Sequence, residues 1–189
     1  MAYVTGIFQG KAKNVKVGET KTGKRKIDFD FILSTDDGNE EKSISVLLLN
    51  DEVEVLEDTI VRIEGKLELN IWQGNSTLKM LSSNVLENLD TEVKDGTIVG
   101  TFKGYPNFIQ EKTTQNGKRI VSCSLSISDK DEEGNWVNDN ISVSLFSEES
   151  TIEEKMPVSF EGVLNINTWE KEGKTQKQLS LLSFNKIEE

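Results

Sequence analysis

The sequence predicts an all-β protein built from two tandem barrels. The first observation is an internal repeat with an offset of 94 positions (100 − 6 = 94), in which Gly6, Phe8, Gly10 and Gly23-Lys24-Arg25 return as Gly100, Phe102, Gly104 and Gly117-Lys118-Arg119. The second is a period-two alternation of apolar and polar residues, which is typical of half-buried strands. The repeat exceeds the ~20–50 residues of a solenoid unit, so each copy is expected to bury its own core.

Five strands are expected in each copy. In the first copy they lie around Gly10 and at 27–33, 44–48, 61–71 and 78–80; in the second they lie around Gly104 and at 121–127, 141–145, 158–164 and 179–181. Glycines inside the first and fourth strands (Gly10, Gly104, Gly65 and Gly162) are expected where a coiled strand must bend. Gly74-Asn75 and Glu172-Gly173 predict the hairpin turns before the last strands.

The expected strand count defines the fold class. The only helix expected is a short turn after the third strand, at 53–58 in the first copy and 150–155 in the second. Five antiparallel strands with a helix at that place describe the five-stranded Greek-key barrel called the OB-fold. A small open sandwich is the structural alternative. The join between the copies is expected near 88–97, which gives one OB-fold domain over 1–90 and a second over 97–189.

Composition limits the possible functions. The net charge of −11 argues against a polyanionic partner, because phosphate contacts need Lys and Arg. Basic residues nevertheless gather between Met1 and Ile27, where Glu19 is the single acid; a scattered solvated surface is the alternative interpretation of this segment. The lone Cys123, the lack of a signal peptide and the lack of an apolar run of ~18 residues lead us to expect a soluble, cytoplasmic protein without membrane contact.

Catalysis and metal binding are not expected. The sequence contains no histidine, the commonest general base and metal ligand at neutral pH. Gly18 to Arg25 resembles a phosphate-binding loop, but Arg25 stands where magnesium needs Ser or Thr. The run that starts at Asp129 imitates a calcium loop, but its twelfth position is Asn140 instead of Glu. We therefore predict no cofactor, no metal and no enzymatic activity.

The aromatic residues suggest a binding surface. Trp72 and Trp169 occupy the same place in the two copies, at the end of the fourth strand beside the hairpin. A third tryptophan, Trp136, lies in a polar loop that offers little core to bury an indole. We favour base stacking over packing at the rim of the core, because an exposed indole provides a surface on which any base can stack.

The second copy resembles bacterial-type single-stranded DNA-binding proteins. The resemblance covers Gly117 to Ile127, Gly134-Asn135-Trp136, Ile141 to Phe146, and the run Val158 to Leu164 with Trp169. It implies that Trp169, Phe146 and Trp136 stack on bases, that Trp72 is the equivalent of Trp169, and that Lys and Arg meet phosphates. The basic candidates are Lys11, Lys13, Lys24, Arg25, Lys26, Lys103, Lys118 and Arg119.

The implied function is binding of single-stranded DNA without sequence preference, and its protection in replication or recombination. The resemblance also implies a homodimer with four OB-folds and contact with replication or recombination proteins. The chain departs from the family in lacking its linker and acidic tip, and this compact form leads us to expect an origin in a phage or mobile element. The copies differ, because Asp28 and Asp30 of the first stand where the second has Ser122 and Ser124, and Leu49 replaces Phe146. We therefore expect stacking from the second copy and mainly electrostatics from the first. A protein-interaction module without nucleic-acid binding is the alternative.

Overall fold

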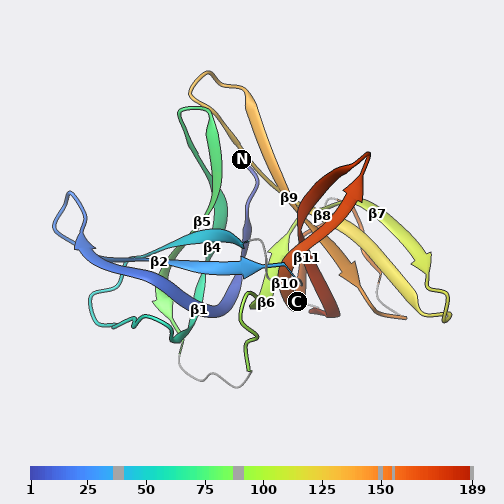
Figure 1. Cartoon of the computed structure of the whole chain (residues 1–189), viewed down its shortest axis with the longest axis horizontal. Helices are drawn as coiled ribbons and strands as arrows, with labels where there is room; N and C mark the ends of the chain where they lie inside the picture. The colour runs from blue at the N-terminus through green and yellow to red at the C-terminus, as the bar shows by residue number, and fades with distance from the viewer. Residues whose placement is uncertain (36–40, 87–91, 149–150, 155, 188–189) are drawn as a thin grey trace.

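The computed structural model describes residues 1–35, 41–86, 92–148, 151–154 and 156–187, and their regular structure consists of β-strands (Figure 1). The first barrel contains β1 (Val4–Glu19), β2 (Arg25–Ser34), β3 (Glu41–Leu48), β4 (Ile60–Trp72) and β5 (Asn75–Val85). The second contains β6 (Ile98–Gly104), β7 (Pro106–Thr113), β8 (Arg119–Lys130), β9 (Trp136–Leu145), β10 (Val158–Lys171) and β11 (Lys174–Ile187). In the described part of the chain no helix is long and apolar enough to cross a membrane.

The first five strands close into a barrel with the order of an OB-fold. The amino-terminal half of β1 pairs with β4 and its carboxyl-terminal half pairs with β2. The ring continues through β2–β3, the parallel pair β3–β5, and β5–β4. Inward residues alternate with outward ones along β2, where Ile27, Phe29, Phe31 and Leu33 are buried. The predicted all-β fold of five-stranded barrels is confirmed, and the open sandwich is wrong.

The second barrel has the same order, but its first strand is divided. β6 pairs with β10, and β7 pairs with β8, so together they take the place of β1. The division falls at Tyr105, directly before Pro106, which cannot donate a backbone hydrogen bond. The rest of the ring consists of β8–β9, the parallel pair β9–β11, and β11–β10.

A pseudo-twofold axis relates the two barrels. β1 and β6 pair antiparallel, so the barrels share one continuous sheet of 11 strands. Equivalent positions of the repeat meet across this axis: the Ile7 N–H donates to Thr101 Oγ1 (3.0 Å), and the rings of Phe8 and Phe102 lie 5.3 Å apart. Lys42 Nζ also lies 3.5 Å from Asp139 Oδ2; the offset of the repeat is 97 at this pair (139 − 42 = 97), because the second copy has a longer middle loop. The charged contact is possible because the copies differ there; two lysines would repel each other.

The predicted helical turn after the third strand is wrong. Residues 53–58 form an irregular segment, and none of the described residues 151–154 is helical; 150 and 155 lie outside the described residues. Side chains replace helical hydrogen bonds here, since Asn50 Oδ1 accepts from the Glu52 and Val53 N–H groups and the Glu57 carboxylate accepts from the Asn14 and Val15 N–H groups. Residues 53–58 are therefore held without a helix.

The predicted hairpin turns are present, one of them shifted by a residue, whereas the domain limits remain a prediction. Glu172 and Gly173 have φ of 53° and 73°, as in the tight turn expected there. The other turn is formed by Gln73 and Gly74 (φ 49° and 77°) instead of Gly74-Asn75, because Asn75 is the first residue of β5 and pairs with Trp72. The limits of 1–90 and 97–189 are not tested, because residues 87–91 lie outside the described residues.

Candidate nucleic-acid interface

The outward face of β8 and β9 is lined by small, uncharged side chains. Alternation along these strands buries Val121, Cys123, Leu125 and Ile127 and turns their neighbours outward. The outward residues pair as Ser122 with Ser144, Ser124 with Ser142, Ser126 with Asn140, and Ser128 with Asn138. We call these eight residues the polar ladder. Since none of them carries a charge, a phosphate backbone can approach the ladder without direct repulsion.

Three aromatic residues predicted for the second barrel lie along or next to the ladder. Trp136 is the first residue of β9; it is exposed, and Lys130 Nζ lies 5.2 Å from its ring centroid. The half-buried Phe146 follows the other end of β9, where its N–H donates to the Ser183 carbonyl. Trp169, 41% exposed, lies on the β10–β11 hairpin, which adjoins the ladder through a 2.9 Å hydrogen bond from Gln178 Nε2 to Asn140 Oδ1.

The same face of the first barrel is charged. Asp28 and Asp30 project from β2, where Asp28 pairs with Lys26 at 2.7 Å. Asp30 accepts hydrogen bonds from Asn14 Nδ2 and Ser45 Oγ. Trp72, 66% exposed, stands beside the β4–β5 turn on the face that also carries the Lys66–Glu68 ion pair. Asp30, whose hydrogen-bond partners are uncharged, would repel a phosphate, whereas Lys26 and Lys66 offset much of the charge of Asp28 and Glu68.

Besides Lys26, two of the predicted phosphate-binding lysines pair with carboxylates. Lys11 Nζ lies 3.1 Å from Asp95 Oδ1, and Lys13 pairs closely with Asp58. The hydrogen bond between Lys13 and Asp58 raises the pKa of Lys13 and lowers the pKa of Asp58. At neutral pH the pair is therefore ionised on both sides, and its stabilisation is lost as the pH falls through the lowered pKa of Asp58 or rises through the raised pKa of Lys13. Each of these two lysines offers less net charge to a phosphate than the sequence suggests.

Both predicted arginines hold the loop that follows the third strand of their barrel. Arg25 Nη1 donates to the Val53 carbonyl at 2.5 Å, and Arg119 Nη1 donates to the Ser147 carbonyl at 3.2 Å. Arg119 also pairs with Glu111, which lowers the pKa of that carboxyl group. Neighbouring lysines are more accessible: Lys24 and Lys118 are exposed at equivalent hairpin turns, where their N–H groups donate to Thr20 and Thr114 hydroxyls.

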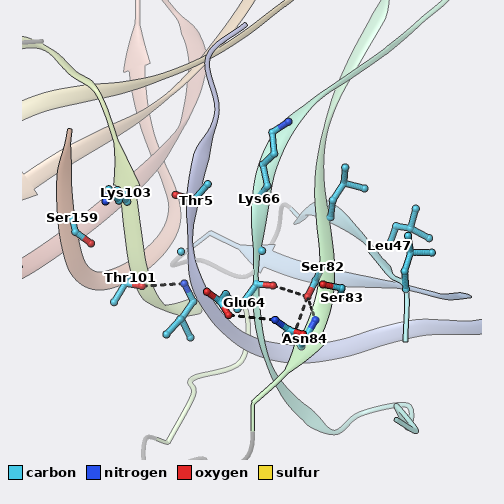
Figure 2. A pocket seen from close by; sticks show the side chains of 15 residues that line it. Thr5, Leu47, Glu64, Lys66, Ser82, Ser83, Asn84, Thr101, Lys103 and Ser159 are labelled. Atoms are coloured by element: carbon cyan, nitrogen blue, oxygen red, sulfur yellow. Dashed lines mark hydrogen bonds between the residues drawn. The ribbon is translucent and has the colours of Figure 1, made fainter. Parts of the chain in front are cut away.

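Lys103 lines a hollow to which no tryptophan contributes. The hollow has a volume of about 720 Å³ and lies on the sheet where β1 and β6 cross, where Lys66, Thr5 and Thr101 also line it (Figure 2). The other side of this hollow is formed by Leu47, Leu49 and Leu81 of the first barrel. A role for Lys103 in phosphate binding thus belongs to a different surface from the polar ladder.

Besides Tyr3, which is 45% exposed, two exposed aromatic residues were missed by the sequence reasoning. Tyr105 is exposed between β6 and β7, and Phe108 is the most exposed of the large hydrophobic residues described. Their signal was present in the repeat, because they stand at the positions of Lys11 and Asn14 (105 − 11 = 94; 108 − 14 = 94). The two copies therefore differ in their exposed aromatic residues as well as in their charges.

The segment from Asp129, whose sequence resembles a calcium-binding loop, forms a hairpin turn between β8 and β9. Asp131 Oδ1 accepts hydrogen bonds from the Glu133 and Asn135 N–H groups, and the hydrogen bonds from Asn135 and its neighbours lower the pKa of Asp131. No group of His, Cys, Asp or Glu side chains within the described ranges could hold a metal ion. Burial raises the pKa of Cys123 to about 12, so its thiol stays protonated and unreactive at neutral pH.

Comparison with known proteins finds similar structures but no similar sequences. No protein-family model matches the sequence, and no match was found among curated proteins. Two crystal structures of the single-stranded DNA binding protein from Thermus aquaticus, the wild type and a deletion mutant, align with the chain at 15% identity and a TM-score of 0.49. The alignments cover 99% of this chain and 92% and 93% of those chains, respectively. At this level the likeness does not establish what the chain binds.

Proposed function

We propose that the protein binds single-stranded DNA without sequence preference, mainly through its second barrel. The observation that supports this function is the uncharged polar ladder with exposed Trp136 and Trp169 next to it, on a chain whose net charge is −11. Each base stacked on an exposed aromatic ring contributes roughly 1–3 kcal/mol whatever its identity. The ladder offers hydroxyl and amide groups to the strand without placing a carboxylate next to its phosphates.

The first barrel adds positive charge mainly through its β1–β2 loop. Lys21 and Lys24 are exposed there, whereas Lys11, Lys13 and Lys26 have carboxylate partners. Lys118 occupies the equivalent place in the second barrel, and Lys130 lies over Trp136. Three further parts of the proposal are supported by the resemblance alone: protection of DNA in replication or recombination, a homodimer with four barrels, and partner proteins from these processes. The compact form of the chain supports a phage-like origin, and the lone Cys123 supports a cytoplasmic location.

A fluorescence titration with oligo(dT) tests this function. Tryptophan emission should be quenched strongly at low salt, because bases stack on exposed indoles. The affinity should fall at least about tenfold as salt rises from roughly 50 to 200 mM if three or more phosphates are contacted. A double-stranded oligonucleotide of the same length is the control. The absence of both quenching and retention on a single-strand column would end this proposal.

Replacing Asp58 with asparagine should increase the affinity for single-stranded DNA. The change releases Lys13, and the left-handed backbone of Asp58 (φ 64°) is one that asparagine adopts readily. We expect an increase of about two- to fivefold at low salt that disappears at high salt, because the released charge is exposed and screened. Fluorescence anisotropy with labelled oligo(dT) measures it.

The control has the same change in net charge at another exposed position, Glu54→Gln. Equal effects of the two substitutions would show that only total charge matters and that Lys13 is not a phosphate ligand. The paired lysines also support the alternative function, a protein-interaction module without nucleic-acid binding. That module would show no binding of oligo(dT) by either the wild type or Asp58→Asn.

A further inference from the structure

A second group of exposed aromatic side chains lies where β6 passes into β7. Phe108 is 80% exposed and Tyr105 is 59% exposed. We call these two residues the aromatic strip. They are separate in sequence and in strand from Trp136, Phe146 and Trp169, which belong to β9, its end and β10.

A β-bulge fixes the backbone of Phe108. The register of β7 on β8 shifts between Asn107 and Gln110, and Phe108 takes a left-handed conformation with φ of 54°. Ile109, the next residue, packs against the core. The bulge therefore turns the phenyl ring into solvent while Ile109 turns inward. Bulky side chains rarely adopt this backbone, which costs free energy for residues other than glycine, asparagine and aspartate.

The first barrel makes the same bulge with a residue suited to it. Asn14 has φ of 55° in β1, and Val15 packs against the core as Ile109 does. Asn14 Nδ2 donates to Asp30 Oδ2 at 2.9 Å. Neither burial nor backbone preference accounts for a phenylalanine at the matching position, so its ring costs stability in the free protein. Strain of this kind at an exposed side chain indicates a binding role.

The aromatic strip borders the polar ladder. Asn107, which lies between Tyr105 and Phe108 in the sequence, pairs with Ser124 of the ladder, and its Nδ2 donates to Ser126 Oγ at 3.0 Å. Tyr105 alternates with the buried Pro106 and so lies on the same outward face as Asn107. The aromatic strip thus lies on the β8 side of the polar ladder, and Trp169 lies beyond the β9 side of the ladder. In the first barrel, the matching Lys11 is held by Asp95.

We propose that Tyr105 and Phe108 form a further base-stacking subsite for single-stranded nucleic acid, across the polar ladder from Trp169. The inference rests on the proposed function, since the ladder is the path of the strand between the two aromatic borders. The ligand group is an unpaired nucleobase, whose flat face stacks on an exposed ring regardless of sequence. The ladder next to the strip carries no charge that would oppose the phosphate linking two stacked bases.

The test exchanges Phe108 for the residue found at the matching bulge. Phe108→Asn should lower the affinity of the full chain for labelled oligo(dT) at least about fivefold. It should leave the affinity for an abasic oligonucleotide of the same length unchanged, because that strand has no base to stack. The melting temperature should stay the same or rise by about 1–4 °C, since asparagine suits the left-handed backbone. Phe108→Tyr, which keeps a ring, should bind oligo(dT) within about twofold of the wild type.

Leu56→Asn is the control for loss of an exposed apolar side chain away from the ladder. Its affinity for oligo(dT) should equal that of the wild type. If Phe108→Asn binds oligo(dT) as tightly as a wild type that itself binds, the aromatic strip is not a stacking subsite and the proposed function survives. If Phe108→Asn weakens binding to the abasic strand as much as to oligo(dT), stacking is again overturned. A wild type that binds neither strand overturns both proposals.

Discussion

Replacing Gly100 with alanine should destabilise the protein by about 2–4 kcal/mol, because β6 crosses β1 there without room for a side chain. A Cβ on Gly100 would lie 1.8 Å from the Ile7 carbonyl oxygen, and a Cβ on Gly6, its counterpart, would lie 1.8 Å from the Thr101 carbonyl oxygen. Both obstacles are backbone atoms, which cannot move unless the two strands separate. These strands hold the barrels together, so the loss should affect the whole chain.

Urea denaturation followed by tryptophan fluorescence measures this effect. Gly18→Ala is the matched control, because Gly18 also lies in β1 but the nearest atom to an added Cβ is Lys26 Cε at 3.6 Å. We expect the control to unfold within about 0.5 kcal/mol of the wild type. An unchanged unfolding midpoint for Gly100→Ala would mean that the strands do not cross as closely as the structure describes.

The barrels were predictable because their signals are periodic. Alternation between Ile27 and Leu33 defines a strand with one buried face, and the repeat shows that the same strand occurs twice. The bends at Gly65 and Gly162 were predictable for the same reason. An added Cβ at either position would lie within 2.6 Å of a backbone carbonyl oxygen, so only glycine fits these bulges.

Contacts between distant segments were not predictable from local patterns. The basic segment contains few acids, but Lys13 meets Asp58 and Lys11 meets Asp95 once the barrel closes. The segment 53–58 has a composition compatible with a helical turn, yet side chains of Asn50 and Glu57 supply its hydrogen bonds. The strand alternation did not reveal the bulge at Phe108, because a bulge interrupts the very period on which the prediction depends.

Replacing Trp169 with alanine should weaken binding of single-stranded DNA by roughly 5- to 150-fold. This range corresponds to the roughly 1–3 kcal/mol that one stacked base contributes to the binding free energy. Trp169 lies on the barrel whose ladder is uncharged, and Gln178 and Asn140 join its hairpin to that ladder. Trp72→Ala should weaken binding less than about threefold, because Trp72 shares its face with an ion pair and its barrel presents the carboxylate of Asp30, which has no charged partner among its hydrogen bonds described above, to the phosphates.

Anisotropy of labelled oligo(dT) compares the two variants without relying on tryptophan emission, and thermal unfolding checks that each remains folded. Trp169 pairs with Gln176, two residue pairs away from its turn, whereas Trp72 pairs with Asn75 directly beside its turn. The hairpin of the second barrel therefore holds Trp169 more firmly than the hairpin of the first holds Trp72. Less side-chain entropy is lost when a base stacks on Trp169. If Trp72→Ala weakens binding more than Trp169→Ala, the two barrels have the opposite roles, and the strand follows the charged face of the first barrel.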